Sequence, residues 1–215
     1  MKPTHKAHPW HGIPIGENAP EIVTTFIEIV PSDTIKYEID KESGYLTIDR
    51  PQKYSNIVPA LYGFIPQTYC GDGIADYARA HGVENVECGD GDPIDICVLS
   101  SHNIPHGDIL LKARPIGGFC FLDKGEADDK IIAVLVGDQL YGQFKDISEL
   151  PDAVMERVKH YFLTYKNLPG EPQQCAIAYE YGVEGAHETR TAGSAAMERK
   201  IVFMPSWLHS PGRHG

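Results

Sequence analysis

Long apolar runs are absent from this sequence. No stretch approaches the roughly 18 to 20 consecutive apolar residues that a membrane-spanning helix needs, so no membrane partner is expected. Residues 1–11 are polar and rich in His and Pro, and they lack the apolar segment of a secretory signal peptide. From these absences we expect a cytoplasmic protein.

Cysteine pairs are absent as well. The five cysteines are odd in number, scattered along the chain, and none forms a CxxC motif. This pattern argues against a disulfide framework and against a zinc ribbon. It favours reduced thiols that pack as small apolar side chains.

Basic residues are outnumbered. The chain has 19 Lys and Arg against 30 Asp and Glu, which gives a formal net charge of −11. Such a surface repels nucleic acid and anionic lipid, so we expect no nucleic-acid partner. A pocket in so acidic a chain can still be locally positive if clustered carboxylates hold metal cations.

The 215 residues contain no internal repeat, low-complexity tract or obvious linker, which predicts a single domain over residues 1–215. Residues 1–20 show little periodicity and predict an irregular N-terminal arm. Residues 67–89 are polar and broken by glycines, which predicts a long excursion between strands. Residues 206–215 contain Pro and Gly and predict a flexible tail.

Strand-like patterns dominate the rest of the chain. Residues 35–39 alternate, with Lys36 and Glu38 on one face, and a Ser-Gly turn leads into residues 45–48, so a hairpin is predicted. Further strands are predicted by short apolar runs at residues 94–99, 109–113 and 131–136. Several short strands in series favour a small barrel over a doubly wound sheet.

Two segments have the periodicity of helices. The first begins at Ser148 or Asp152 and ends before a Pro-Gly pair at residues 169–170, and the second covers about residues 186–199. The predicted fold class is therefore mainly β, or α+β.

The most specific motif is an aspartate cluster at residues 89–95. Asp90, Asp92 and Asp95 fall within six residues and precede a short apolar run. Hard cations such as Mg²⁺ bind in this kind of oxygen-rich setting. A solvated acidic turn is the plain alternative. A helix-loop-helix calcium site does not fit, because Pro93 interrupts the loop and a strand follows it.

A second acidic cluster strengthens the metal interpretation. Asp123, Asp128 and Lys130 lie at residues 123–130, directly before the apolar run that starts at residue 131. A charge run by itself is usually a solvated loop. Two acidic clusters at the starts of neighbouring strands indicate a centre with two or more metal ions.

Basic and phenolic residues stand where a phosphate group would need them. Each has an ordinary structural explanation, such as a cross-strand ion pair, a tyrosine at the core edge or a lysine at a helix C-terminus. The set consists of Lys36, Arg50, Tyr62, Lys130, Tyr165 and Lys166.

Together these residues resemble the soluble inorganic pyrophosphatases of family I. The aspartate motif at residues 90–95 matches that family's signature, and the other motifs follow in the family's order over roughly residues 22–200. The excursion at residues 67–89 resembles a subgroup that carries an insertion there. The resemblance implies hydrolysis of inorganic pyrophosphate to two phosphates, several Mg²⁺ ions per active site, and a homo-oligomer. It also implies a small closed OB-like β-barrel with two flanking α-helices.

The resemblance assigns a role to each site residue. Asp90, Asp95 and Asp128 match direct metal ligands, Asp123 matches the ligand of a further Mg²⁺ delivered with the substrate, and Glu28 matches an outer-sphere partner.

For the substrate, the resemblance makes Asp92 the general base that takes a proton from the attacking water. The phosphate-binding groups would be the six basic and phenolic residues named above. Val58 stands where the family often has tyrosine, and Lys124 stands where an acidic residue often follows Asp123.

Two other functions stay open from the residues alone. A metal-dependent nucleotide-sugar transferase could use the aspartate motif, although the alternating βαβ pattern and Gly-rich loop of a nucleotide-binding sheet are missing. A non-catalytic OB-type binding module would need a basic groove with stacking side chains, which this acidic chain offers little of. His5, His8 and His11 have the spacing of a transition-metal site, but a mobile arm with incidental histidines is favoured.

Overall fold

Short strands rich in Val, Ile and Phe form most of the structure, as these residue types favour a pleated and half-buried surface. A computed structural model describes residues 6–167 and 170–202, apart from the side chains of residues 196–202. The main sheet contains β1 (Val23–Ile29), β4 (Leu61–Phe64), β5 (Cys88–Gly89), β6 (Asp95–Leu99), β7 (Ile109–Asp123), β8 (Glu126–Ala127), β9 (Lys130–Leu135) and β10 (Cys175–Gly182). A separate hairpin pairs β2 (Ile35–Ile39) with β3 (Leu46–Pro51).

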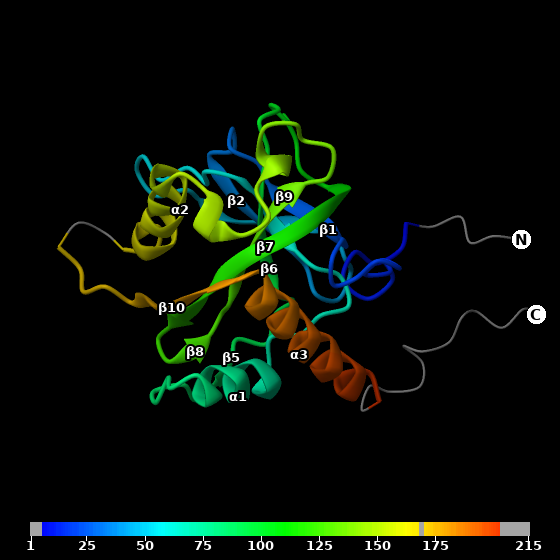
Figure 1. The fold of residues 1–215 in the computed structure, drawn as a ribbon, viewed down its shortest axis with the longest axis vertical. Coiled ribbons are helices and arrows are strands. Elements are labelled where there is room, and N and C mark those ends of the chain that lie inside the picture. The colour runs from blue at the N-terminus through cyan, green and yellow to red at the C-terminus, as the bar shows by residue number, and fades with distance from the viewer. Residues whose placement is uncertain (1–5, 168–169, 203–215) are drawn as a thin grey trace, which may run out of the picture.

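The main sheet coils back on itself (Figure 1). Strand β1 pairs antiparallel with both β4 and β7. The remaining pairings run from β4 to β6, from β6 to β9 and from β9 to β7, so the path of paired strands returns to β1. The expected sheet-dominated α+β fold is thus confirmed, and its strands form the closed circuit of a small OB-like barrel.

Two glycines permit this geometry. A Cβ atom at Gly63 would lie 1.9 Å from the carbonyl oxygen of Phe26, so only glycine lets β4 pass this close to β1. In β7 the pairing register to β9 shifts between Pro115 and Gly117, and Gly117 has a φ of +152°. This irregularity lets one long strand bend and pair with β1 near its start and with β10 near its end.

The two expected helices are present. Helix α2 (Asp152–Thr164) follows a short 3₁₀ turn at Ile147–Glu149 and buries Met155, Val158 and Phe162, which share one face at helical spacing. Helix α3 (Val183–Val202) packs against β7, and a Cβ at Gly193 would lie 2.1 Å from the side chain of Ile94. Small residues on this face allow the close approach.

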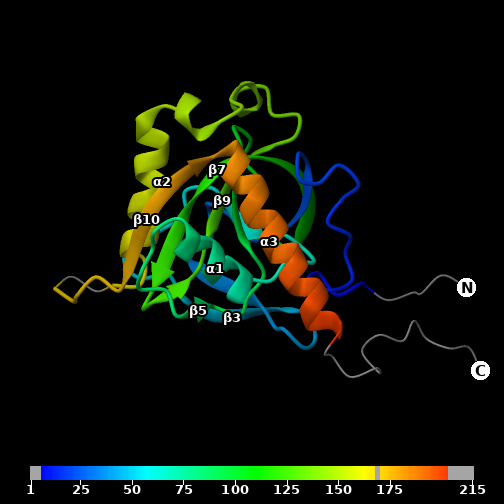
Figure 2. The same ribbon diagram turned by 60° about the horizontal axis from the view of Figure 1, so that its bottom comes forward.

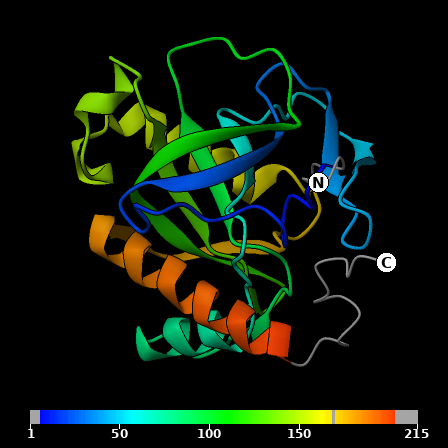
Figure 3. The ribbon, with the colours of Figure 1, turned by 90° about the vertical axis from the view of Figure 1, so that its right-hand side faces the viewer.

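The excursion at residues 67–89 contains a third helix that the sequence patterns did not predict. Helix α1 (Asp72–Ala80) lies beside α3 on one side of the barrel, and α2 covers another side (Figures 2 and 3). Its buried residues Ile74, Ala75 and Ala78 are few and mostly small, and glycines flank the segment. The expected count of two flanking helices is therefore too low.

The N-terminal arm has no helix or strand over residues 6–20, but it is docked on the barrel. Trp10 is 1% exposed, and its indole N–H donates to the carbonyl of Thr68 at 2.7 Å. Trp10 also packs with Phe26, Ile39 and Phe64. The idea of a mobile arm is thus wrong around Trp10. The expected tail at residues 206–215 and His5 lie outside the described residues. Across the described part of the chain, no helix is long and apolar enough to cross a membrane.

Candidate active site

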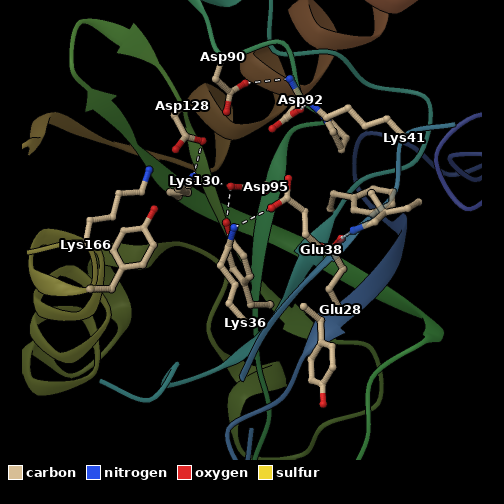
Figure 4. A pocket seen from close by; sticks show the side chains of 16 residues that line it. Glu28, Lys36, Glu38, Lys41, Asp90, Asp92, Asp95, Asp128, Lys130 and Lys166 are labelled. Atoms are coloured by element: carbon tan, nitrogen blue, oxygen red, sulfur yellow. Dashed lines mark hydrogen bonds and ion pairs between the residues drawn. The ribbon is translucent and has the colours of Figure 1, made fainter. Parts of the chain in front are cut away.

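One pocket between the open end of the barrel and the β2–β3 hairpin gathers the predicted chemistry (Figure 4). Its lining includes every predicted site residue except Arg50 and Asp123. The predicted residues in the lining are Glu28, Lys36, Tyr62, Asp90, Asp92, Asp95, Asp128, Lys130, Tyr165 and Lys166.

Strand pairing brings the two acidic clusters together. Strands β6 and β9 are parallel neighbours, and their first residues, Asp95 and Lys130, are paired in register. Parallel strands that start side by side place the segments before them at the same edge of the sheet. The loop with Asp90 and Asp92 therefore meets the loop with Asp128 over one end of the barrel. Asp90 N–H donates to the carbonyl of Ala127 at 3.1 Å and ties these two loops together.

Lys130 is the buried cation at the floor of the pocket. Its side chain is 1% exposed and its ammonium contacts Oδ2 of Asp95 and Oδ1 of Asp128. The rings of Phe121 and Phe162 lie 5.3 and 5.5 Å from the ammonium. Burial works against the charge, but the two carboxylates prevail and raise the pKa of Lys130 well above its usual value.

The carboxylates of the floor are crowded beyond what one lysine can neutralise. Burial raises the pKa of Asp90, and nearby Asp128 adds to this effect. The pKa of Asp95 is also raised by burial, against the opposing effect of Lys130. Burial and the charge of Asp95 raise the pKa of Glu28 to about 8. Excess negative charge of this kind is what a divalent cation relieves.

As the side chains lie, no group of three His, Cys, Asp or Glu residues in the described part of the chain is arranged to hold a metal ion. The contacts explain this: the ammonium of Lys130 lies between Asp95 and Asp128, and Tyr62 O–H donates to Asp95 Oδ2. The donor set of clustered carboxylates nevertheless fits a hard, oxygen-binding cation such as Mg²⁺.

The β2–β3 hairpin forms one wall of the pocket. Lys36 Nζ lies 3.0 Å from Glu38 Oε2 and 2.9 Å from Asp49 Oδ2. Arg50 is paired with Lys36 across the hairpin, and its guanidinium also contacts Asp49. Arg50 therefore does not line the pocket, and it is linked to the pocket through Asp49 and Lys36.

The opposite wall comes from the end of α2. Tyr165 and Lys166 follow the helix directly, and Tyr165 stacks on Tyr161 with ring centroids 5.3 Å apart. The ammonium of Lys166 contacts Oδ2 of Asp123, the last residue of β7. Asp123 thus reaches the pocket through Lys166.

Comparison with known proteins identifies the family. A family model described as inorganic pyrophosphatase matches residues 25–199. The chain belongs to the inorganic pyrophosphatase family. It is similar to the inorganic pyrophosphatase of Chlamydia trachomatis serovar L2, with 50% identity over 86% of this chain and 91% of the relative. The inorganic pyrophosphatase of Chlamydia muridarum is 49% identical over the same shares.

Solved structures agree with this assignment. The fold matches the crystal structure of inorganic pyrophosphatase from Thermus thermophilus with a TM-score of 0.73, at 28% identity, over 90% of this chain and 99% of that one. The inorganic pyrophosphatase of Helicobacter pylori matches with a TM-score of 0.70, at 30% identity, over 86% of this chain and 98% of that one.

The pocket of this inorganic pyrophosphatase family member also contains residues to which the sequence patterns assign no role. Glu38 and Lys41 both line the pocket. Both lie within five residues of Lys36, and this closeness in the sequence was the signal that could have found them. Val58, which stands where the family often has tyrosine, is buried in the core. Lys124 is exposed in a turn with a φ of +53°.

The arm histidines have structural contacts. Nδ1 of His8 accepts from the backbone N–H of Trp10 at 3.2 Å and of His11 at 3.3 Å. The rings of His8 and His11 stack with centroids 4.6 Å apart. His8 therefore organises the turn around Trp10, a structural role that the expectation of incidental histidines in a mobile arm did not include.

Proposed function

We propose that this chain hydrolyses inorganic pyrophosphate to two phosphates in the pocket described above, by direct attack of water. Membership of the inorganic pyrophosphatase family supports the reaction. The reaction is assigned to this pocket because clustered carboxylates and several cationic side chains line it together. Asp90, Asp95 and Asp128 converge at one end, and Lys36 and Lys166 line the same pocket.

The carboxylates are proposed to hold Mg²⁺. Asp90, Asp95 and Asp128 would be direct ligands, Asp123 would bind a further ion, and Glu28 would support them from outside. Bound divalent cations neutralise phosphate charge and make water acidic enough to yield hydroxide near neutral pH.

The chain's own residues then perform the remaining tasks. Asp92 would accept the proton of the attacking water. Its loop is fixed, because Cys70 N–H donates to the carbonyl of Asp92 at 2.7 Å and Gly91 N–H donates to the carbonyl of Cys70 at 2.8 Å. The phosphate oxygens would be held by Lys36, Arg50, Tyr62, Lys130, Tyr165 and Lys166. Their positive charges and hydroxyl groups offset the charge that develops on the leaving phosphate.

The test is phosphate release from pyrophosphate, measured with metal-stripped protein, with added Mg²⁺, and with a nucleotide-sugar diphosphate in place of pyrophosphate. We expect hydrolysis of pyrophosphate that needs Mg²⁺ and is restored by it after chelation. Full activity without metal contradicts the metal assignment, and preferential turnover of the nucleotide sugar contradicts the substrate. Homo-oligomerisation, a cytoplasmic location and the lack of a nucleic-acid partner stay predictions, and sedimentation velocity measures the first of these.

A further inference from the structure

Lys41 lies in the tight turn that connects β2 to β3. Asp40 N–H donates to the carbonyl of Tyr45 at 2.8 Å, and Gly44 N–H donates to the carbonyl of Asp40 at 2.8 Å. The carboxylate of Asp40 also accepts from the backbone N–H of Ser43 at 2.7 Å. Gly44 has a φ of +74°, which a side chain would strain. The backbone around Lys41 is therefore held in one conformation.

The turn is also anchored to the barrel from both sides. A Cβ at Gly44 would lie 2.9 Å from the ring of His8 and 2.9 Å from Pro9, so the N-terminal arm packs directly on the turn. On the strand before the turn, Ile39 N–H donates to Glu28 Oε1 at 2.7 Å, and the Ile39 side chain packs with Trp10. These contacts fix where the side chain of Lys41 starts.

From this position the Lys41 ammonium reaches across the pocket to Asp92. It contacts Oδ1 of Asp92, and Figure 4 shows Lys41 entering the pocket from the side opposite Lys166. The Lys41 side chain is 50% exposed and that of Asp92 is 33% exposed, so the pair lies at the pocket mouth. Glu38 and Asp90 are the other charged groups whose fields act on Lys41.

The other pocket lysines are engaged elsewhere. Among the described residues, Lys36 is paired with Glu38 and Asp49, Lys130 with Asp95 and Asp128, and Lys166 with Asp123. Lys41 is the pocket lysine that contacts the carboxylate of Asp92 in the described structure. The backbone of Asp92 is fixed by Cys70, which leaves the side-chain torsions as its remaining freedom.

We propose that Lys41 is a positioning residue that holds the Asp92 carboxylate in one orientation over the pocket. This inference rests on the proposed function of Asp92 as the base. An ammonium on one carboxylate oxygen removes alternative side-chain orientations and leaves the second oxygen to meet the water. The ammonium also offsets the charge of Asp92 without a metal ion.

A double-mutant cycle tests the proposal. The variants are Lys41→Met, Lys41→Arg, Asp92→Asn, and Lys41→Met combined with Asp92→Asn, with Lys145→Met as an exposed control outside the pocket. Under saturating Mg²⁺ we expect Lys41→Met to lower kcat by about 10- to 100-fold, as misplacement of a catalytic group does. KM should change little, and Lys41→Arg should recover most of the loss. In the Asp92→Asn background, Lys41→Met should cost nothing further, because the two residues act as one unit.

A second readout does not depend on turnover. Calorimetric Mg²⁺ titration of Lys41→Met should give an affinity within about fivefold of wild type, the most that a half-exposed ion pair contributes. A larger change shows that Lys41 acts on the metal sites and overturns the proposal. A raised KM with unchanged kcat, or an equal loss of kcat in the Asp92→Asn background, shows that Lys41 binds substrate directly and overturns it too.

The outcome is separable from that of the proposed function. Should the wild type release no phosphate from pyrophosphate, the proposed reaction fails. Crystal structures of wild type and Lys41→Met then decide the positioning role alone. An Asp92 carboxylate that keeps its orientation without Lys41 overturns the role, and one that adopts several orientations supports it.

Discussion

Replacing the buried cation of the pocket floor, Lys130→Met, tests the electrostatics of the site most directly. Methionine fills the same space beside Phe121 and Phe162 but removes the charge that Asp95 and Asp128 share. The Asp95 and Asp128 side chains are only 18% and 10% exposed, so water cannot replace the ammonium well. Removing one partner of such a buried pair costs about 3–5 kcal/mol in unfolding free energy.

The assay is urea unfolding at neutral pH in the presence of a chelator. The cost should shrink on addition of Mg²⁺, because the cation takes over the counter-charge, while activity should stay low if Lys130 also binds phosphate. The pH dependence follows from Asp128. Burial opposes ionisation there, but Lys130 prevails and lowers its pKa. Because its pKa is lower in the folded protein, ionised Asp128 stabilises the fold above its unfolded pKa of about 4, and this stability is lost as the pH falls further. The difference in unfolding free energy between variant and wild type should therefore narrow below about pH 4.

Lys159→Met is the matched control. Lys159 is paired with Glu156 and Glu180 on the surface, where the two carboxylates are 69% and 41% exposed. Its loss should cost about 0–1 kcal/mol. A Lys130→Met cost as small as this would refute the reasoning, since it would mean that the carboxylates of the floor need no counter-ion.

Three further predictions concern single groups of the site. Asp92→Asn should slow the chemical step by about 10²- to 10⁴-fold with little change in Mg²⁺ affinity. Asp95→Asn should instead weaken Mg²⁺ binding and regain part of its activity at high Mg²⁺. Calorimetry and saturating-metal kinetics compare the two variants, and full recovery of activity by the Asp92 variant at high Mg²⁺ would make that residue a ligand. Arg50→Lys should lose activity, because a point charge cannot reproduce a forked contact to phosphate. Wild-type kinetics would instead fit a structural ion pair with Asp49. Glu28→Gln should stabilise the metal-free protein by ~2 kcal/mol or more at pH 8 and much less at pH 5. Burial raises the pKa of Glu28 in the folded protein to about 8, so the stability that this group contributes is present below its pKa in the unfolded chain and is lost as the pH rises through its folded pKa. Equal urea midpoints for variant and wild type at pH 8 would contradict this.

Local patterns were sufficient for several elements. The alternation of residues 35–39 predicted β2, and the helical spacing of buried residues predicted α2, because side chains of one kind that share a face recur at a fixed period in the sequence. Helix α1 was not predicted, because its buried face is built mostly from alanine, and so small an apolar face gives only a weak periodic pattern in the sequence. The burial of Trp10 was not predicted for another reason. A single large residue in an irregular arm forms no periodic pattern, and only its contacts with Phe26 and Phe64 show that it belongs to the core.

For the site, too, some features were predictable from local sequence and others depended on the tertiary structure. The sequence by itself determined which carboxylates and cations are available, since runs such as residues 90–95 are dense enough in aspartate to require cations if they converge. Whether they converge was decided by tertiary structure, through the parallel register that sets Asp95 beside Lys130. Tertiary structure also left Arg50 out of the pocket lining, paired with Asp49, and brought Lys41 to Asp92. Chemical type is a property of each residue, whereas proximity between residues far apart in the chain depends on strand register and packing, which single-sequence patterns do not contain.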